Sequence, residues 1–163
     1  MATRRAGAVV ATVYATLGLL RDEVEARVVN LTPTAIPTTR FVRRPLRDRA
    51  VRDFAACTGK GRLVELGMGT GGYDTPTIGH TARRYEYRLP LQIMYQDTPE
   101  WRRAALDDAD RIAQDLREHY SAAPSGVQIR HIDTEEQPTI EPHEDDPWFV
   151  LSLTVYAMIC VEP

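Results

Sequence analysis

The glycine-rich stretch LVELGMGTGGYDTP, from Leu63 to Pro76, has residue types that could bring the backbone close to a nucleotide-like cofactor. Such a loop works because its glycines admit the ligand and because a helix follows whose first N–H groups point at it. Here Gly72 is followed by Pro76 and Gly79, and then by residues with the period of a strand. We therefore expect residues 67–79 to form a connecting loop that contacts a partner and binds no cofactor.

Three other sets of residues could in principle do chemistry, and none has the spacing that the chemistry requires. Thr58-Gly59-Lys60-Gly61 lacks the upstream glycine of a phosphate-binding loop and the Ser or Thr that follows its lysine. The serines lie outside any GxSxG turn. A group of imidazoles and carboxylates could surround a divalent metal, but its spacing matches no ligand motif: His131, Asp133, His143, Glu144, Asp145 and Asp146. We expect no catalytic residue, metal or cofactor.

Two segments of opposite charge indicate contacts between proteins instead. Six arginines fall between positions 40 and 52, and an acidic loop is expected from Asp133 to Asp146. Each segment fits a solvated face as well as it fits a contact in which the positive edge of one copy meets the negative edge of the next. The arginines could also contact the phosphates of passing DNA, which would make binding strongly salt-dependent. The residues expected at a partner or ring interface are Arg40, Arg43, Arg44, Arg47, Gly69, Gly71, Gly72, Tyr73, Glu141, Glu144, Asp145 and Asp146.

Composition limits the class of protein. A chain of 163 residues, 43% of them hydrophobic, favours one domain over residues 1–163. The net charge of −3 excludes a protein that binds nucleic acid with its whole surface. Cys57 and Cys160 form no CxxC pair and favour a reducing cytoplasm. The N-terminal apolar run lacks the cleavage site of a signal peptide and is too short to span a bilayer.

Two amphipathic helices are expected to position these segments. The first runs from about Ala8 to Val28, with one apolar stripe made of Val9, Val13, Leu17, Leu20, Val24 and Val28. The second begins at Thr98-Pro99-Glu100, which supplies an N-cap hydroxyl and a proline at the first helical position. It ends near Tyr120, and its stripe is Trp101, Ala105, Leu106, Ala109, Ile112, Ala113, Leu116 and Tyr120. A further short helix is expected from Leu46 to Cys57.

Two long segments alternate between apolar and polar residues and are expected to be strands, namely Arg83–Tyr95 and Trp148–Val161. Shorter strands are expected at Arg40–Arg43, Leu63–Leu66 and Val127–Ile132. Pro90 has no N–H to donate, so part of its strand should lie at a sheet edge or a bulge. The elements predict an α+β fold, with a largely antiparallel sheet and two main amphipathic helices packed on one face.

This order of elements resembles the tail-terminator, or tail-completion, proteins of tailed bacteriophages, which are small α+β proteins. The resemblance covers most of the chain: an N-terminal helix, a proline-containing link to short strands, the long strand RRYEYRLPLQIMYQD, the helix WRRAALDDADRIAQDLREHY and the closing strand WFVLSLTVYAMICVEP. The segment from Arg43 to Gly79 does not match the family pattern.

The resemblance implies a structural virion protein and no enzyme. Such a protein would form a ring, typically a hexamer, that caps the tail tube, stops its growth and joins it to a neck or head-completion protein. DNA would pass through the pore, the ring would assemble in the host cytoplasm, and no membrane would be involved. Another neck or connector ring protein is the alternative within the virion. A small S-adenosylmethionine-binding enzyme that uses Gly67–Gly72 is the alternative from a different class.

Overall fold

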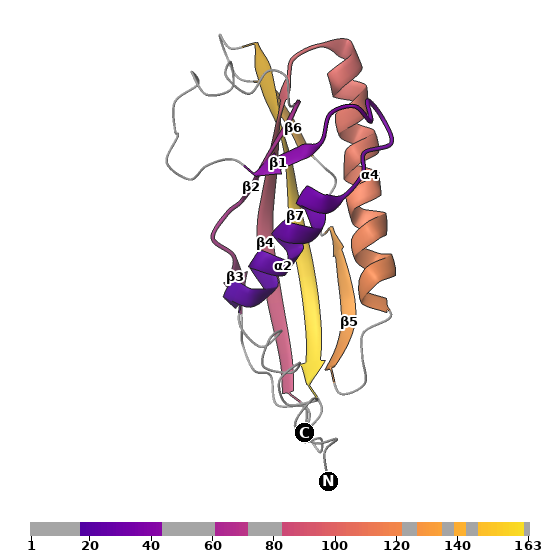
Figure 1. The fold of residues 1–163 in the computed structure, drawn as a ribbon. Helices are drawn as coiled ribbons and strands as arrows, with labels where there is room; N and C mark the ends of the chain where they lie inside the picture. The colour runs from indigo at the N-terminus through magenta and orange to yellow at the C-terminus, as the bar shows by residue number, and fades with distance from the viewer. Residues whose placement is uncertain are drawn as a thin grey trace.

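The protein folds as one seven-stranded sheet with two helices over the part of the chain that the structure describes (Figure 1). The computed structural model describes residues 17–43, 61–71, 83–121, 127–134, 139–142 and 147–161. The elements in chain order are α2 (Leu17–Asn30), β1 (Phe41–Arg43), β2 (Arg62–Leu66), β3 (Thr70–Gly71), β4 (Arg83–Gln96), α4 (Pro99–Ser121), β5 (Val127–Thr134), β6 (Thr139–Pro142) and β7 (Trp148–Val161).

The two long strands form the centre of the sheet. β4 and β7 pair antiparallel over 14 residues each, from Arg83 opposite Val161 to Gln96 opposite Trp148. β2 and β3 pair with the far side of β4, and β5 and β6 pair with the far side of β7. β1 extends the sheet beyond β2 and is parallel to it, whereas the other pairs are antiparallel. The predicted α+β class with a largely antiparallel sheet is confirmed.

Both helices pack on the same face of the sheet, as predicted. Figure 1 shows α2 crossing the strands obliquely and α4 running along them. Alternation along the strands turns the odd-numbered residues of β4 and β7 toward the helices. One buried cluster therefore joins the two layers: Leu20, Val24 and Val28 from α2; Ala105, Ala109, Ile112 and Leu116 from α4; Tyr87, Leu89, Leu91, Ile93 and Tyr95 from β4; and Phe149, Leu151, Leu153, Val155 and Ala157 from β7.

The helix α4 begins where its capping residues predict. The N–H of Trp101 donates to Oγ1 of Thr98 at 3.3 Å, which satisfies a free donor of the first turn. Leu106 was expected on the buried stripe, and this prediction is wrong, because its side chain is 49% exposed. At 3.6 residues per turn Leu106 lies about 100° from the centre of the buried stripe. Asp108 lies on the opposite flank of that stripe and is fully buried.

The structure describes only part of the remaining elements that the sequence predicts. The described part of the first helix extends from Leu17 to Asn30, and residues 8–16 lie outside the described residues, as does the helix expected over 46–57. Part of the segment expected as an acidic loop is strand, since β5 continues to Thr134 and β6 occupies 139–142. β6 forms because Ile140 packs against the core cluster while its neighbours remain exposed.

Pro90 lies in an inner strand, but at a local break in the pairing of that strand. β2 ends at Leu66 opposite Leu91, and β3 begins at Thr70 opposite Arg88. The carbonyl of Pro90 accepts a hydrogen bond from the N–H of Gly67 at 2.9 Å, so its nitrogen faces the same interrupted side. The carbonyl of Gly67, opposite the missing N–H, accepts from Nε of Arg21 instead, which agrees with the expectation of a local edge at the proline. No helix among the described residues is both long enough and apolar enough to cross a membrane.

Candidate functional site

The structure describes five of the twelve residues that the sequence predicts at an interface, namely Arg40, Arg43, Gly69, Gly71 and Glu141. The other seven lie outside the described residues: Arg44, Arg47, Gly72, Tyr73, Glu144, Asp145 and Asp146. The five fall into three places, which are the β1 margin of the sheet, the β6 margin and the loop between β2 and β3.

The β1 and β6 margins lie at opposite sides of the sheet but at the same level along the strands. The register is continuous across five strands, and one row of paired residues is Glu141, Val150, Met94, Leu63 and Val42. Among the described strands, β1 pairs only with β2 and β6 pairs only with β7. Both margins therefore present backbone groups that no described strand uses.

The two margins carry charges of opposite sign. Arg40 and Arg43 flank the β1 margin, and both are exposed. Nε of Arg43 lies 2.5 Å from Oε1 of Glu25 on α2, a carboxylate whose side chain is only 5% exposed. Arg43 thus neutralises a buried acid of its own chain and still leaves 61% of its side chain exposed. Glu141 is exposed on β6.

The loop between β2 and β3 is held by contacts from two elements, α2 and β4. Nη2 and Nε of Arg21 on α2 donate to the carbonyls of Leu66 and Gly67 at 2.9 and 3.3 Å. Gly71 has a φ of +118°, and a Cβ there would lie 2.0 Å from the carbonyl oxygen of Glu86, so only glycine allows β3 to approach β4 this closely. Met68 at the tip of this fixed loop is 89% exposed.

The strand directions around this loop differ from those of a cofactor-binding βαβ unit. In such a unit the strand before the glycine loop is parallel to the next strand, with a crossover helix between them. Here β2 is antiparallel to β4, and Thr70 and Gly71 are themselves strand residues paired with Arg88 and Tyr87. The glycine at 71 is accounted for by close packing of backbone on backbone.

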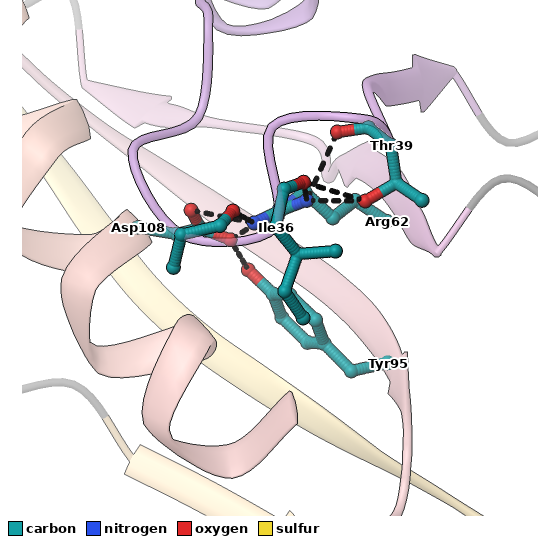
Figure 2. A network of polar contacts seen from close by, with 6 residues as sticks. Ile36, Thr39, Arg62, Tyr95 and Asp108 are labelled. Carbon is teal, nitrogen blue, oxygen red and sulfur yellow. Dashed lines mark hydrogen bonds and ion pairs between the residues drawn. The ribbon is translucent and has the colours of Figure 1, made fainter. Parts of the chain in front are cut away.

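A buried ionic cluster that the sequence did not predict lies between the sheet and α4 (Figure 2). The guanidinium of Arg62 on β2 donates from Nε and Nη2 to the two carboxylate oxygens of Asp108 on α4, at 2.5 and 3.1 Å. The hydroxyl of Tyr95 on β4 donates to Oδ2 of Asp108 at 3.0 Å. Both charged side chains are 0% exposed. The bidentate pair with an added hydroxyl donor satisfies the buried carboxylate.

The same arginine fixes the loop between α2 and β1. Its Nη2 donates to the carbonyl of Ala35, and its Nη1 donates to the carbonyl and hydroxyl oxygens of Thr39 at 3.0 and 2.7 Å. The carbonyl of Ile36 accepts bonds from Arg62, from the N–H of Thr39 and from the hydroxyl of Thr39. These donors hold Ile36 at a φ of +48°, a conformation that a β-branched residue rarely adopts.

The protonation states of the cluster follow from its burial. Burial raises the pKa of Asp108 above its ordinary value, while the hydrogen bonds from Arg62 and Tyr95 act in the opposite direction. Burial, followed by the Asp108 carboxylate, raises the pKa of Tyr95 well above its ordinary value, so the phenol keeps the proton that it donates. Because the charged atoms are inaccessible and their bonds are internal, the cluster is a structural centre.

A shallow groove lies between α2 and α4 on the helical side. Arg27 on α2 and Asp115 on α4 form an ion pair across it, with Nε and Oδ2 2.7 Å apart. Arg111 and Glu23 also line it, so its walls carry both signs of charge. Among the described residues no group of three or more His, Cys, Asp or Glu side chains could hold a metal ion. The acids and histidine expected at 143–146 lie outside those residues.

No protein-family model and no curated protein matches this chain. Among solved structures, the chain is similar to one chain of a structure described as "Virion of native gene transfer agent (GTA) particle". The two are 15% identical, the match covers 71% of this chain and 88% of that chain, and the TM-score is 0.45. A TM-score this low supports no inference about function.

Proposed function

We propose that this protein is a structural virion component that closes into a ring in the manner of a phage tail terminator. In this role the ring caps the tail tube, ends tube growth and joins the tube to a neck or head-completion protein. The order of helices and strands supports the proposal, since the described elements follow the order on which the resemblance to tail terminators rests.

One observation carries the proposal: the sheet is covered by helices on one face and has an open margin at each side among the described strands. Surfaces on two sides of a subunit allow head-to-tail contacts, and such contacts close into rings when the rotation between copies closes. A ring of copies related in this way keeps the β2–β3 loop, with its exposed Met68, available for other rings.

The test is the growth of tail tubes in the presence of this protein. Tubes assembled from the tube protein encoded in the same genome are measured by negative-stain microscopy, with and without the purified chain. A terminator is expected to appear as a ring at one tube end and to stop further extension when fresh tube protein is added. A protein that remains monomeric by sedimentation with tubes present, and that leaves tube extension unchanged, contradicts the proposal.

Two measurements distinguish a tail terminator from the two alternatives, a neck or connector ring and an S-adenosylmethionine-binding enzyme. A neck or connector ring would form rings and leave tube growth unaffected. Calorimetry with S-adenosylmethionine and its demethylated product tests the enzyme, which would bind them saturably at micromolar concentration. The antiparallel pairing of β2 with β4 and the packing of Gly71 against Glu86 both favour the structural role over that enzyme.

A further inference from the structure

We propose that β1 of one copy pairs with β6 of the next copy, so that the sheets of neighbouring subunits form one continuous sheet around the ring. This inference rests on the proposed ring and names the surfaces that close it. β1 and β6 have free outer edges among the described strands, and Thr139, Glu141 and Pro142 on β6 are exposed. Strand addition at such an edge uses the backbone groups that the free subunit leaves to water, apart from the N–H that Pro142 lacks.

The level of the two margins favours a closed ring. Val42 on β1 and Glu141 on β6 lie in the same row of the sheet, through Leu63, Met94 and Val150. A neighbour that brings its β6 beside β1 at this level is related by a rotation with little translation along the strands. Contacts without such translation close on themselves, whereas contacts with a translation climb into a helical filament.

The strand directions are compatible with this pairing. β1 is parallel to β2, and β2 is antiparallel to β4. β4 is antiparallel to β7, and β7 is antiparallel to β6, so β1 and β6 run in opposite directions within one subunit. A rotation about an axis along the strands preserves these directions. β1 and the neighbour's β6 then meet as an antiparallel pair, which is the more favourable ladder.

The charges select the pairing of unlike margins. Two β1 margins would bring Arg40 of one copy against Arg40 of another, and two β6 margins would oppose Glu141 to itself. Like charges placed opposite each other across strands destabilise the pair, whereas opposite charges stabilise it. Only the β1 to β6 contact joins arginine to glutamate, and this contact uses a different surface on each partner, as a ring requires.

The faces of the two margins also match. Val42 extends the small apolar cluster of Leu63, Met94 and Trp148 on the face opposite the helices. Glu141 shares the row and face of Val42, and Thr139 lies two residues away on that same face. Ile140 packs into the core on the helical face instead. Antiparallel pairing therefore brings Val42 beside Thr139 or Glu141 of the neighbour and keeps it away from Ile140.

Disulfide trapping tests this geometry directly. In a background of Cys57→Ser and Cys160→Ser, we would combine Val42→Cys with Glu141→Cys in one chain and with Thr139→Cys in another. Four inter-strand spacings separate the two cysteines of one subunit, about 19 Å at the usual strand spacing. A disulfide needs Cα atoms within about 7 Å, so only a bond between copies can form. After mild oxidation of the ring, a ladder of covalent oligomers is expected for at least one of the two variants.

The matched control is Val42→Cys with Ile140→Cys, whose second cysteine lies on the helical face and should give no ladder. Charge exchange provides a second measurement that does not depend on cysteines. Arg40→Glu should weaken association about fivefold, and adding Glu141→Arg should restore it. Arg103→Glu, an exposed arginine on α4, should leave association unchanged.

The outcomes separate this inference from the proposed function. A ring seen by sedimentation that gives no ladder with either variant overturns the β1 to β6 pairing and leaves the ring intact. A ladder from a protein that neither binds tube ends nor stops tube growth supports the pairing and contradicts the terminator role. A ladder with Ile140→Cys as strong as the stronger of those with Glu141→Cys and Thr139→Cys also overturns the pairing.

Discussion

Arg62 joins three separate parts of the chain at one point. Its guanidinium binds Asp108 on α4 and the carbonyls of Ala35 and Thr39, and its carbon atom Cζ lies 5.3 and 5.1 Å from the ring centres of Phe41 and Trp101. The guanidinium is therefore surrounded by two aromatic rings and by oxygen acceptors for its N–H groups. Since β1 follows this loop directly, the arginine also fixes the position of the basic margin.

Asp108→Ala is expected to lower the free energy of unfolding by about 3 to 5 kcal/mol, because it leaves the Arg62 charge buried without its partner. Urea unfolding followed by circular dichroism measures the change. Asp110→Ala on the exposed side of the same helix is the control, and it should change the free energy by less than about 0.5 kcal/mol. Equal stability of the two variants would show that Arg62 does not depend on Asp108.

The sequence held a weak signal for this cluster. Asp108 lies three residues after Ala105 and four before Ile112, so it falls within the spacing of the apolar stripe of α4. An acid at such a position predicts a buried partner. The identity of that partner could not be predicted, because Arg62 lies 46 residues earlier and only the folded sheet brings the two together.

The N-terminus of α4 shows how local sequence determines one element. Thr98 caps the helix, and Arg102 donates from Nε and Nη2 to the two carboxylate oxygens of Asp97 at 2.7 and 3.0 Å. The hydrogen bond from Arg102 lowers the pKa of Asp97 below its ordinary value. Because the pair is exposed, it contributes little to the free energy of unfolding. This contribution depends on pH.

Because Asp97 has a lowered pKa in the folded state, its contribution to stability is present above the unfolded pKa of about 4 and is lost as the pH falls through the folded pKa. The free energy of unfolding of the native protein should therefore fall more than that of Asp97→Asn between about pH 5 and about pH 2. Urea titrations across this range measure the two slopes. Arg102→Gln should behave like Asp97→Asn, and identical acid slopes for all three proteins would contradict the prediction.

The long elements and the short strands β1, β2 and β5 were predicted from the sequence, whereas β3 and β6 were not. β4, β7 and α4 repeat their apolar period often enough to be recognised from the sequence. β3 has two residues and β6 has four, which is too few for any period, and their pairing depends on the strands beside them. β6 was therefore included in an expected acidic loop. Its pairing with β7 places Glu141 at the margin of the sheet, where this residue is exposed.

For the whole molecule, the important feature is the spatial relation between segments far apart in the chain. The sequence predicted opposite charges at residues 40–52 and 133–146 but could not show that they flank one sheet. Their described members lie at its two sides and at one level because β2, β4 and β7 connect them in continuous register. A difference in charge along the sequence thereby becomes a difference in charge across the subunit.

If the margins attract each other through these charges, association should weaken as salt is added. Screening shortens from about 10 Å at about 0.1 M salt to about 3 Å at about 1 M, so Arg40 and Glu141 should attract each other less. Sedimentation velocity across this range should show the ring giving way to monomer. The double variant Arg40→Gln with Glu141→Gln should associate more weakly at low salt and show a flatter dependence. Association that strengthens with salt would instead indicate that apolar contacts around Val42 hold the copies together, since salt that is excluded from the protein surface favours apolar burial.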